Sequence, residues 1–541
     1  MADDSTSSRA AKKNFAWALL MPSAADSMFV AMLSLLILSS LSVRLLGDAG
    51  IGWHIRTGQL ILATHSIPRV DPFSSIMKGK PWFAWEWLYD VVAGGLDRVA
   101  GLNGVVLFTA VIIAAVFSWT FGLLLQRSTN LFVALTLVLL AASAAMIHFL
   151  ARPHVVTWLL ALTWFWLLDD SEISCFGVNS LRRSDWRLWF LPPLMLFWVN
   201  VHGGFLTGFV VLGIYLASAA WVWFRSSEDR LDSLLQRLRA ARRVRKLAVI
   251  TALAAAATLV NPYGWRLHLH IYHYLSDRFL MNHIDEFQSP NFHDVAEKCF
   301  AVLLLIAFVA LAAKGRELRS SEVLIVLFAV FSGLYASRNL PVSSLLVALV
   351  IGPPLSRVLK EFSEKGNVSH AVRRLCGSAT TFSTRMKAVE STLRGHVWPI
   401  AAIVAACWIA VHGGKVGSTT LMKAHFGEKR FPVRAVDYLE AQADNAPVLC
   451  PDYWGGYLIY RLYPRVLVAM DDRHDLYGSE LLKSYLKLMK AQPGWDEFLA
   501  KYEIRRVLVP KGSTVDNLLR ENENAWGITY EDPRAVLFVA R

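Results

Sequence analysis

The chain has 541 residues, of which 55% are hydrophobic and only 18% are charged, and its mean hydropathy is +0.40. In soluble domains roughly a quarter of all residues are charged, so this composition argues against a soluble protein and favours a membrane protein. The net charge of +13 would suggest nucleic-acid binding in a soluble chain. In a membrane protein, basic cytoplasmic loops explain it, and we expect no nucleic-acid partner.

Apolar stretches near the ~20 residues needed to cross a bilayer recur along the first three quarters of the chain. The N-terminal residues are polar or mixed and lead straight into a span, so we expect a cytoplasmic segment at 1–27 and no cleavable signal peptide. The five cysteines form no CxxC pair, which argues against a zinc cage or a disulfide framework. We predict a polytopic α-helical membrane protein with about eleven spans: 28–46, 103–125, 131–150, 153–168, 188–201, 203–224, 247–261, 297–313, 321–337, 340–356 and 397–412.

The basic loops give the predicted orientation. With the N-terminus in the cytoplasm, alternation of the spans places 225–246, 314–319 and 357–396 inside, and all three are rich in Lys and Arg. This agrees with the positive-inside rule. The membrane domain then covers 28–412, with an outer loop at 47–102, and the segment 413–541 lies outside the inner (plasma) membrane.

In this orientation the outer face collects most of the unusual polar residues. Ionisable groups at helix ends in a membrane protein are costly, and by default they indicate a functional site. The clusters are Asp48, His54 and Arg56 after the first span, Arg152 and His154, Asn200 and His202, Asn261 and Tyr263, Glu286, and the turn with Arg338 and Asn339.

The outer loop 47–102 predicts two helices. The first covers about 53–64, and the second is KPWFAWEWLYDVVAGGL at 80–96. In the second helix Trp82, Trp85 and Tyr89 share one face, which predicts that it lies in the water–lipid interface. Glu86 and Asp90 share another face, which is either a solvated acidic edge or part of the site.

From Lys415 onward the composition becomes that of a soluble domain. Helical and strand-like segments alternate, with strands predicted at APVLC, RVLVAMDD, RRVLVP and AVLFVAR, so we predict a small α/β domain. The acids Asp471 and Asp472 end one predicted strand. Such acids can mark a site, but capping and turn formation are their more frequent use, and we predict no catalytic role for them.

These features resemble the GT-C superfamily of glycosyltransferases, which take sugars from polyprenyl-phosphate carriers. The resemblance rests on a first helix that ends in an acid, an outer two-helix loop, about ten further helices and an outer α/β domain. The stretch DYWGGYLIYRLYPRVLVAMDDR is similar to the outer-domain signature of oligosaccharyltransferases, a WWDYG box followed by a strand and an acid. Its Asp452, Tyr453, Trp454 and Gly455 stand in another order, so recognition of an acceptor sequon does not carry over.

The resemblance implies that Asp48 is the catalytic base, with Glu86 as the alternative. Inverting transfer needs a carboxylate to deprotonate the acceptor hydroxyl, and cations to stabilise the leaving phosphate. Arg152 and Arg338 are the predicted phosphate ligands, because the guanidinium fork matches phosphate geometry. His54, His154, His202 and Asn200 are candidates for sugar hydroxyls or for steadying the phosphate, and Arg56, Asn261, Tyr263, Glu286 and Asn339 complete the predicted substrate-binding set.

No DxD motif is present, and His268, His270 and His273 have no carboxylate at convincing ligand spacing. The sequence therefore predicts no cofactor, although a divalent metal stays open. The predicted partners are a polyprenyl-phosphate-linked sugar, the bilayer, and a glycan, lipid or protein acceptor.

Three other functions compete with glycosyl transfer: a transporter or flippase of lipid-linked saccharides, a polymerase or ligase of the O-antigen type, and a scaffold whose tail binds an envelope partner. Paired repeats with helices broken at the membrane midplane would favour a transporter, and the sequence shows none. In an O-antigen polymerase or ligase, the main outer loop would lie late among the spans.

Overall fold

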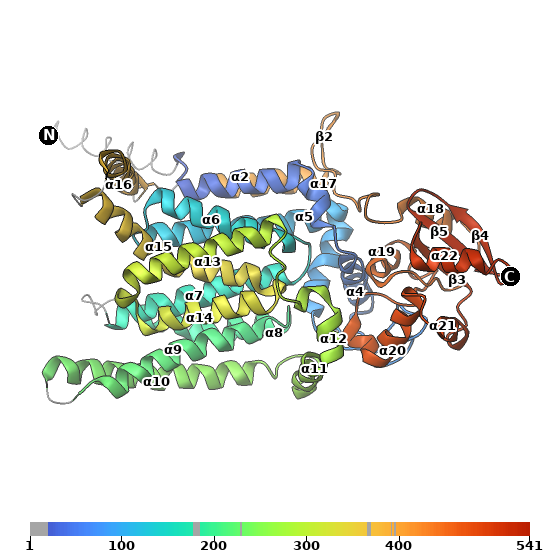
Figure 1. Ribbon diagram of the computed structural model, residues 1–541, viewed down its shortest axis with the longest axis horizontal. Coiled ribbons are helices and arrows are strands. Elements are labelled where there is room, and N and C mark those ends of the chain that lie inside the picture. Colours follow the sequence, from blue (N-terminus) through green and yellow to red (C-terminus); the bar gives the residue numbers. More distant parts are fainter. Residues whose placement is uncertain (1–19, 177–183, 228–229, 365–368, 391, 394–395) are drawn as a thin grey trace, which may run out of the picture.

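The computed structural model describes residues 20–541 except 177–183, 228–229, 365–368, 391 and 394–395. Residues 1–19 of the predicted cytoplasmic segment 1–27 therefore lie outside the described part of the chain. The described residues form a long helical bundle with a smaller mixed domain at one end (Figure 1).

Each predicted span coincides at least partly with a helix. The bundle contains α2 (Ala24–Leu38), α3 (Leu41–Leu45), α5 (Trp87–Gln126), α6 (Leu131–Ala145), α7 (His154–Phe176), α8 (Leu191–Val199), α9 (Phe205–Arg225), α10 (Leu231–Ala257), α13 (Val295–Lys314), α14 (Ser320–Tyr335), α15 (Leu340–Glu364) and α17 (Val397–Val411). Among the described residues, five helices are long and apolar enough to cross a membrane, and three shorter apolar helices accompany them. The total of about eleven spans stays a prediction.

Two predicted spans differ in form from the expectation. The segment 188–201 is divided between a 3-10 segment, η2 (Ser184–Phe190), and the nine-residue helix α8, which starts with a proline in its first turn. Proline lacks a backbone N–H and is best accommodated in the first turn of a helix, so a new helix starts there. The predicted span 247–261 overlaps the second half of α10, which ends at Ala257, and the basic stretch before it is already helical.

The bundle has two distinct ends (Figure 1). The turns with the predicted outer clusters face the C-terminal domain. Helix α16 (His370–Glu390) and the basic first half of α10 lie at the opposite end. The basic segments and the turns with the predicted outer clusters thus lie at opposite ends of the molecule. The orientation of these ends relative to a membrane stays a prediction.

A reporter fused after Arg541 tests the orientation. We expect periplasmic or extracellular reporter activity, because the C-terminal domain lies at the end remote from the basic loops, which stay inside. A matched fusion in the loop after Arg225 should report the cytoplasm. Cytoplasmic activity of the C-terminal fusion would reverse the orientation and place the outer clusters on the wrong side.

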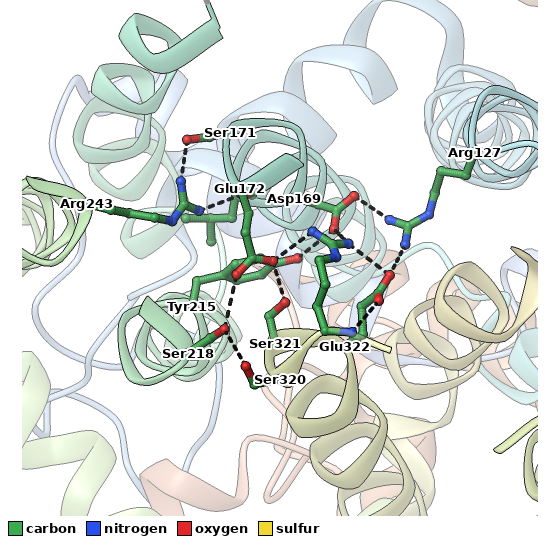
Figure 2. A network of polar contacts seen from close by, with 12 residues as sticks. Arg127, Asp169, Ser171, Glu172, Tyr215, Ser218, Arg243, Ser320, Ser321 and Glu322 are labelled. Atoms are coloured by element: carbon green, nitrogen blue, oxygen red, sulfur yellow. Dashed lines mark hydrogen bonds and ion pairs between the residues drawn. The ribbon is translucent and has the colours of Figure 1, made fainter. Parts of the chain in front are cut away.

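A buried ionic network links the helices at the end of the bundle that carries the basic loops (Figure 2). Arg319 pairs with Glu172 at 2.8 Å and with Glu322 at 2.9 Å, and it also contacts Asp169. Arg127 pairs with Glu322 at 2.6 Å and contacts Asp169 as well. Hydroxyl groups of α9 and α14, together with the Arg243 guanidinium of α10, complete the network. Because each buried acid has a cationic or hydroxyl partner, these charges hold five helices together at this end.

The C-terminal domain carries an antiparallel sheet of three strands in the order β3–β5–β4: β3 (Arg506–Pro510), β5 (Ala535–Ala540) and β4 (Trp526–Glu531). Its helices are α18 (Val433–Ala441), α19 (Asp452–Leu462), α20 (His474–Met489), α21 (Trp495–Lys501) and α22 (Thr514–Glu521). A small hairpin of β1 (Lys415–Val416) and β2 (Thr419–Thr420) precedes them. The segments predicted as strands at 446–450 and 465–472 form isolated bridges instead: Leu449 to Val507, Val448 to Val468 and Ser74 to Val468. Strand β4 was not predicted.

The outer loop is built into this domain. Its first predicted helix is present as α4 (Gly50–Thr64), but the second starts only at Trp87. Trp82 and Trp85 therefore precede the helix, and the prediction of a shared aromatic face in the lipid interface is wrong. Trp82 is buried, with its ring at 6.3 Å from Trp53 and 4.7 Å from the Arg473 guanidinium, because the outer domain covers it.

Helix α5 changes direction at Gly101, where φ is 58°. This backbone conformation costs an L-residue energy but suits glycine. The part before the kink packs on α4, and the part after it runs into the bundle. The kink thus separates the residues of α5 that pack on α4 from the residues of α5 that belong to the helical bundle.

Candidate functional site

Two carboxylates and one arginine meet where the bundle joins the outer domain. Asp48 accepts a hydrogen bond from the Gly50 backbone N–H at 2.7 Å, at the start of α4. Arg152, just before α7, donates from Nη1 to Asp48 Oδ2 at 3.2 Å. The same Nη1 lies 3.9 Å from Oδ2 of Asp472, and Trp53 Nε1–H donates to Asp472 Oδ1 at 3.0 Å. Arg152 therefore lies between one carboxylate of the membrane domain and one of the outer domain.

The contact between α4 and α19 brings these groups together. A Cβ atom on Gly52 would lie 2.1 Å from the carbonyl oxygen of Gly456, and one on Gly456 would lie 2.2 Å from the carbonyl oxygen of Ala49. Only glycines permit so close an approach of two backbones. This contact sets the outer domain directly on the start of α4.

The sequence DDRHD at 471–475 fixes the outer domain to the loop and to the bundle's outer end. Its side chains point to different neighbours, because the chain turns here between a buried segment and α20. The ion pairs are Arg473 with Asp71 (2.8 Å), Arg473 with Asp471 (2.7 Å), His474 with Asp452 (2.9 Å) and Asp475 with His270 of α11 (Trp265–Ser276) (3.0 Å). Asp472 is the member of this run that reaches Arg152.

A second buried cluster surrounds Glu86. His54 Nδ1 lies 2.5 Å from Asp90 Oδ1, and His54 Nε2 lies 3.7 Å from Glu86 Oε2. The other Glu86 oxygen lies 3.7 Å from His202 Nε2. Asp90 is fully buried, so the interpretation of a solvated acidic edge is wrong for it. Glu86 and Asp90 both face His54. His202 Nδ1 accepts from the Gly204 N–H at 3.0 Å, which directs its Nε2–H toward Glu86.

Burial determines the charge of this cluster. It lowers the pKa of His54 well below its ordinary value, and Arg152 lowers it further, so the imidazole is neutral. Burial also raises the pKa of Glu86 to about 8, although Arg152 opposes the rise. Glu86 is therefore largely protonated near neutral pH, and a protonated carboxyl is a hydrogen-bond donor rather than a base.

Arg338 lies on the same side of the molecule, paired with Glu286 at 3.3 Å and stacked on Phe287 at 4.3 Å. Burial alone would raise the pKa of Glu286, but Arg338 and Arg152 together lower it to about 2. Both predicted phosphate ligands thus act electrostatically on Glu286, while only Arg338 is in contact with it.

Several predicted substrate ligands are already engaged within the protein. Asn200 accepts from Trp87 Nε1–H, and its amide donates to the carbonyls of Leu196 and Val260. Arg56 binds the carbonyl oxygen of Tyr460. These contacts hold α5, α8 and α19 in place, so a structural role explains both residues.

The same holds for the predicted residues in the turns. Polar residues at turns commonly satisfy the turn backbone, and these side chains do so: Asn261 bonds Thr258, Gly264 and Tyr263; Tyr263 bonds Ala84 and Pro68; Asn339 donates to Ser332; and His154 Nε2 contacts the His148 carbonyl. Their predicted roles in binding substrate stay untested.

Asp472 is the site residue that the sequence interpretation missed. The signal was the run of three ionisable residues directly after Asp471 and Asp472, which is more charge than capping requires. Among the described residues, no group of three or more His, Cys, Asp or Glu side chains is arranged to hold a metal ion.

The fold is similar to that of the oligosaccharyltransferase of Archaeoglobus fulgidus in its apo form, with a TM-score of 0.53 and 11% identity over 90% of this chain and 69% of that one. AglB of the same organism, in complex with an inhibitory peptide and a dolichol-phosphate, gives 0.52 and 11% over the same shares. ArnT of Cupriavidus metallidurans in the apo state gives 0.49 and 12% over 95% of this chain and 97% of that one. No protein-family model and no curated protein matches the sequence. The chain therefore has a GT-C-like fold, distantly similar to that of the archaeal oligosaccharyltransferases.

Proposed function

We propose that this protein is an inverting glycosyltransferase, which moves a hexose or pentose from a polyprenyl-phosphate donor to a hydroxyl acceptor at the outer face of the inner (plasma) membrane. The observation that carries the proposal is the 3.2 Å contact between Asp48 and Arg152. It joins a carboxylate able to take a proton to a guanidinium able to bind phosphate. The fold supports the donor class, because the similar AglB binds a dolichol-phosphate.

In the proposed reaction, the acceptor oxygen forms a bond to the anomeric carbon of the sugar while its proton passes to Asp48. The bond from that carbon to the phosphate oxygen breaks, and the phosphate leaves with the electron pair. Arg152 and Arg338 stabilise its charge. Within the described part of the chain, Arg152 donates a side-chain hydrogen bond only from Nη1, so Nε–H and Nη2 remain for the phosphate.

Glu86 has a different role in this proposal. As a buried, largely protonated carboxyl it donates a hydrogen bond to the substrate, and the Asp90–His54 pair and His202 hold its orientation. His54 then acts through Glu86, because its own side chain is fully buried.

The test is transfer by the purified full chain from a radiolabelled polyprenyl-phosphate sugar to an acceptor extract. We expect labelled acceptor and released polyprenyl phosphate in equal amounts. Movement of the intact donor across vesicles without chemical conversion would replace the proposal by a transport function.

The phosphate ligands give a separate prediction. Arg152→Lys and Arg338→Lys keep the charge but lose the bidentate geometry. We expect weaker donor binding with the fold intact, measured as KM for the donor together with the thermal unfolding temperature. Arg434→Lys, at an exposed pair with Glu428, is the matched control. An unchanged donor KM in both site variants would contradict the assignment.

A further inference from the structure

The strongest feature without an assigned role is Asp472, the second carboxylate that faces the Arg152 guanidinium. Asp472 comes from the outer domain, yet its Oδ2 atom would lie only 2.7 Å from a Cβ placed on Gly50, beside Asp48. One guanidinium thus faces two carboxylates. A donor phosphodiester brings a third negative charge to the same guanidinium, in a site whose three side chains are 15–25% exposed.

We propose that Asp472 is a positioning residue that acts through Arg152, and that it takes up a proton when the donor phosphate binds. The inference rests on the proposed function and deepens it, because it makes the outer domain part of donor binding. Buried charge is costly unless it is paired, so uptake of one proton from solvent offsets the charge that the phosphate brings.

Asp472 is better suited than Asp48 to take the proton. Asp48 has the shorter contact to Arg152, 3.2 Å against 3.9 Å. It also accepts a backbone N–H at the start of α4, where the helix dipole favours negative charge. Within the described residues, the hydrogen bond to the Asp472 carboxylate comes from a neutral donor, the indole N–H of Trp53. The carbonyl oxygen of a protonated Asp472 carboxyl can accept that N–H equally well. Asp48 therefore stays the assigned base, and Asp472 is the group assigned to take up the proton.

The other charged groups around Asp472 act in opposite directions, and burial decides the balance. Asp471 adds negative charge from its own loop, and His474 of α20 adds an opposing contribution, while Arg152 is the cation that faces it from the bundle. Burial first, then Asp48 and Asp471, raise the pKa of Asp472 to about 7 against Arg152 and His474. A further anion can only raise this pKa, so proton uptake occurs near neutral pH.

The probe for the test is a polyprenyl methyl phosphate, a diester whose single charge does not titrate. For wild-type full chain in detergent, we expect affinity for the diester to fall as pH rises above about 7, approaching tenfold per pH unit if uptake of one proton is fully linked. Calorimetry in two buffers of different ionisation enthalpy should show proton uptake directly.

Asp472→Asn keeps the acceptor for Trp53 but removes the titrating charge, so binding should become independent of pH, within about twofold. Asp475→Asn, three residues further along in the first turn of α20 and in contact with His270, should keep the wild-type pH dependence. The inference is overturned if wild-type protein binds the diester without proton uptake, or if Asp472→Asn keeps the pH dependence. Failure of wild-type protein to bind the diester at any pH would instead reject the proposed donor, and the inference with it.

Discussion

Replacement of Asp48 by Asn should lower turnover by about 10²–10⁴-fold, the usual loss when a general base is removed. Asn still accepts the hydrogen bond from the Gly50 N–H, so the start of α4 keeps its form, but the side chain cannot take the acceptor's proton. Donor binding should persist, because Arg152 and Arg338 supply it. Single-turnover transfer and donor affinity, measured on the same preparation, separate the two effects.

The matched variant is Glu86→Gln. Because Glu86 is largely protonated in its buried site, an amide that still donates a hydrogen bond should retain much of the activity. Wild-type turnover in Asp48→Asn would remove the base assignment, and an inactive Glu86→Gln in the same assay would transfer it to Glu86.

The second large effect concerns stability. Arg473→Met should destabilise the outer domain and its contact with the loop by about 3–5 kcal/mol, the range for removing one partner of a buried ion pair. Arg473 is almost fully buried, pairs with Asp71 and Asp471, and lies 4.7 Å from the ring of Trp82. Methionine fills part of the space but leaves both carboxylates without their cation.

Thermal unfolding and limited proteolysis of the full chain measure this loss. Arg434→Met is the control, because its pair with Glu428 is largely exposed and such sites usually change stability by within about 0.5 kcal/mol. If both variants unfold at the same temperature, the Arg473 pairs do not hold the domain in place.

The helix positions could be predicted because apolar length is a strong signal for a membrane protein. The same signal located Asp48, Arg152 and Arg338, since alternating spans bring every second helix end to one side. Individual roles were harder to predict. Asn200 and Asn261 stand at helix ends as Arg152 does, but their amides bond nearby backbone carbonyls, and sequence spacing does not reveal which polar group is already engaged.

The loop between Thr64 and Trp87 shows another reason why part of the sequence-based prediction was wrong. Trp82 and Trp85 have helical spacing, but both precede the helix. Trp82 contacts Arg473 and Trp85 contacts His270, and both partners are distant in sequence. Asp472 was missed for the same reason: its neighbours Trp53 and Arg152 belong to other parts of the chain, and no local pattern records that approach.

The backbone contact between the outer loop and Val468 bears on how this architecture can be recombined. Ser75 N–H donates to the Val468 carbonyl at 2.7 Å, and Val468 N–H donates to the Phe73 carbonyl at 3.3 Å. A fragment made only of 413–541 would leave that edge bare, and an unpaired edge invites association with other chains. The C-terminal domain therefore cannot be exchanged alone. A chimera has to exchange the segment around Phe73 as well, because the two stretches form one structural unit although more than 300 residues separate them.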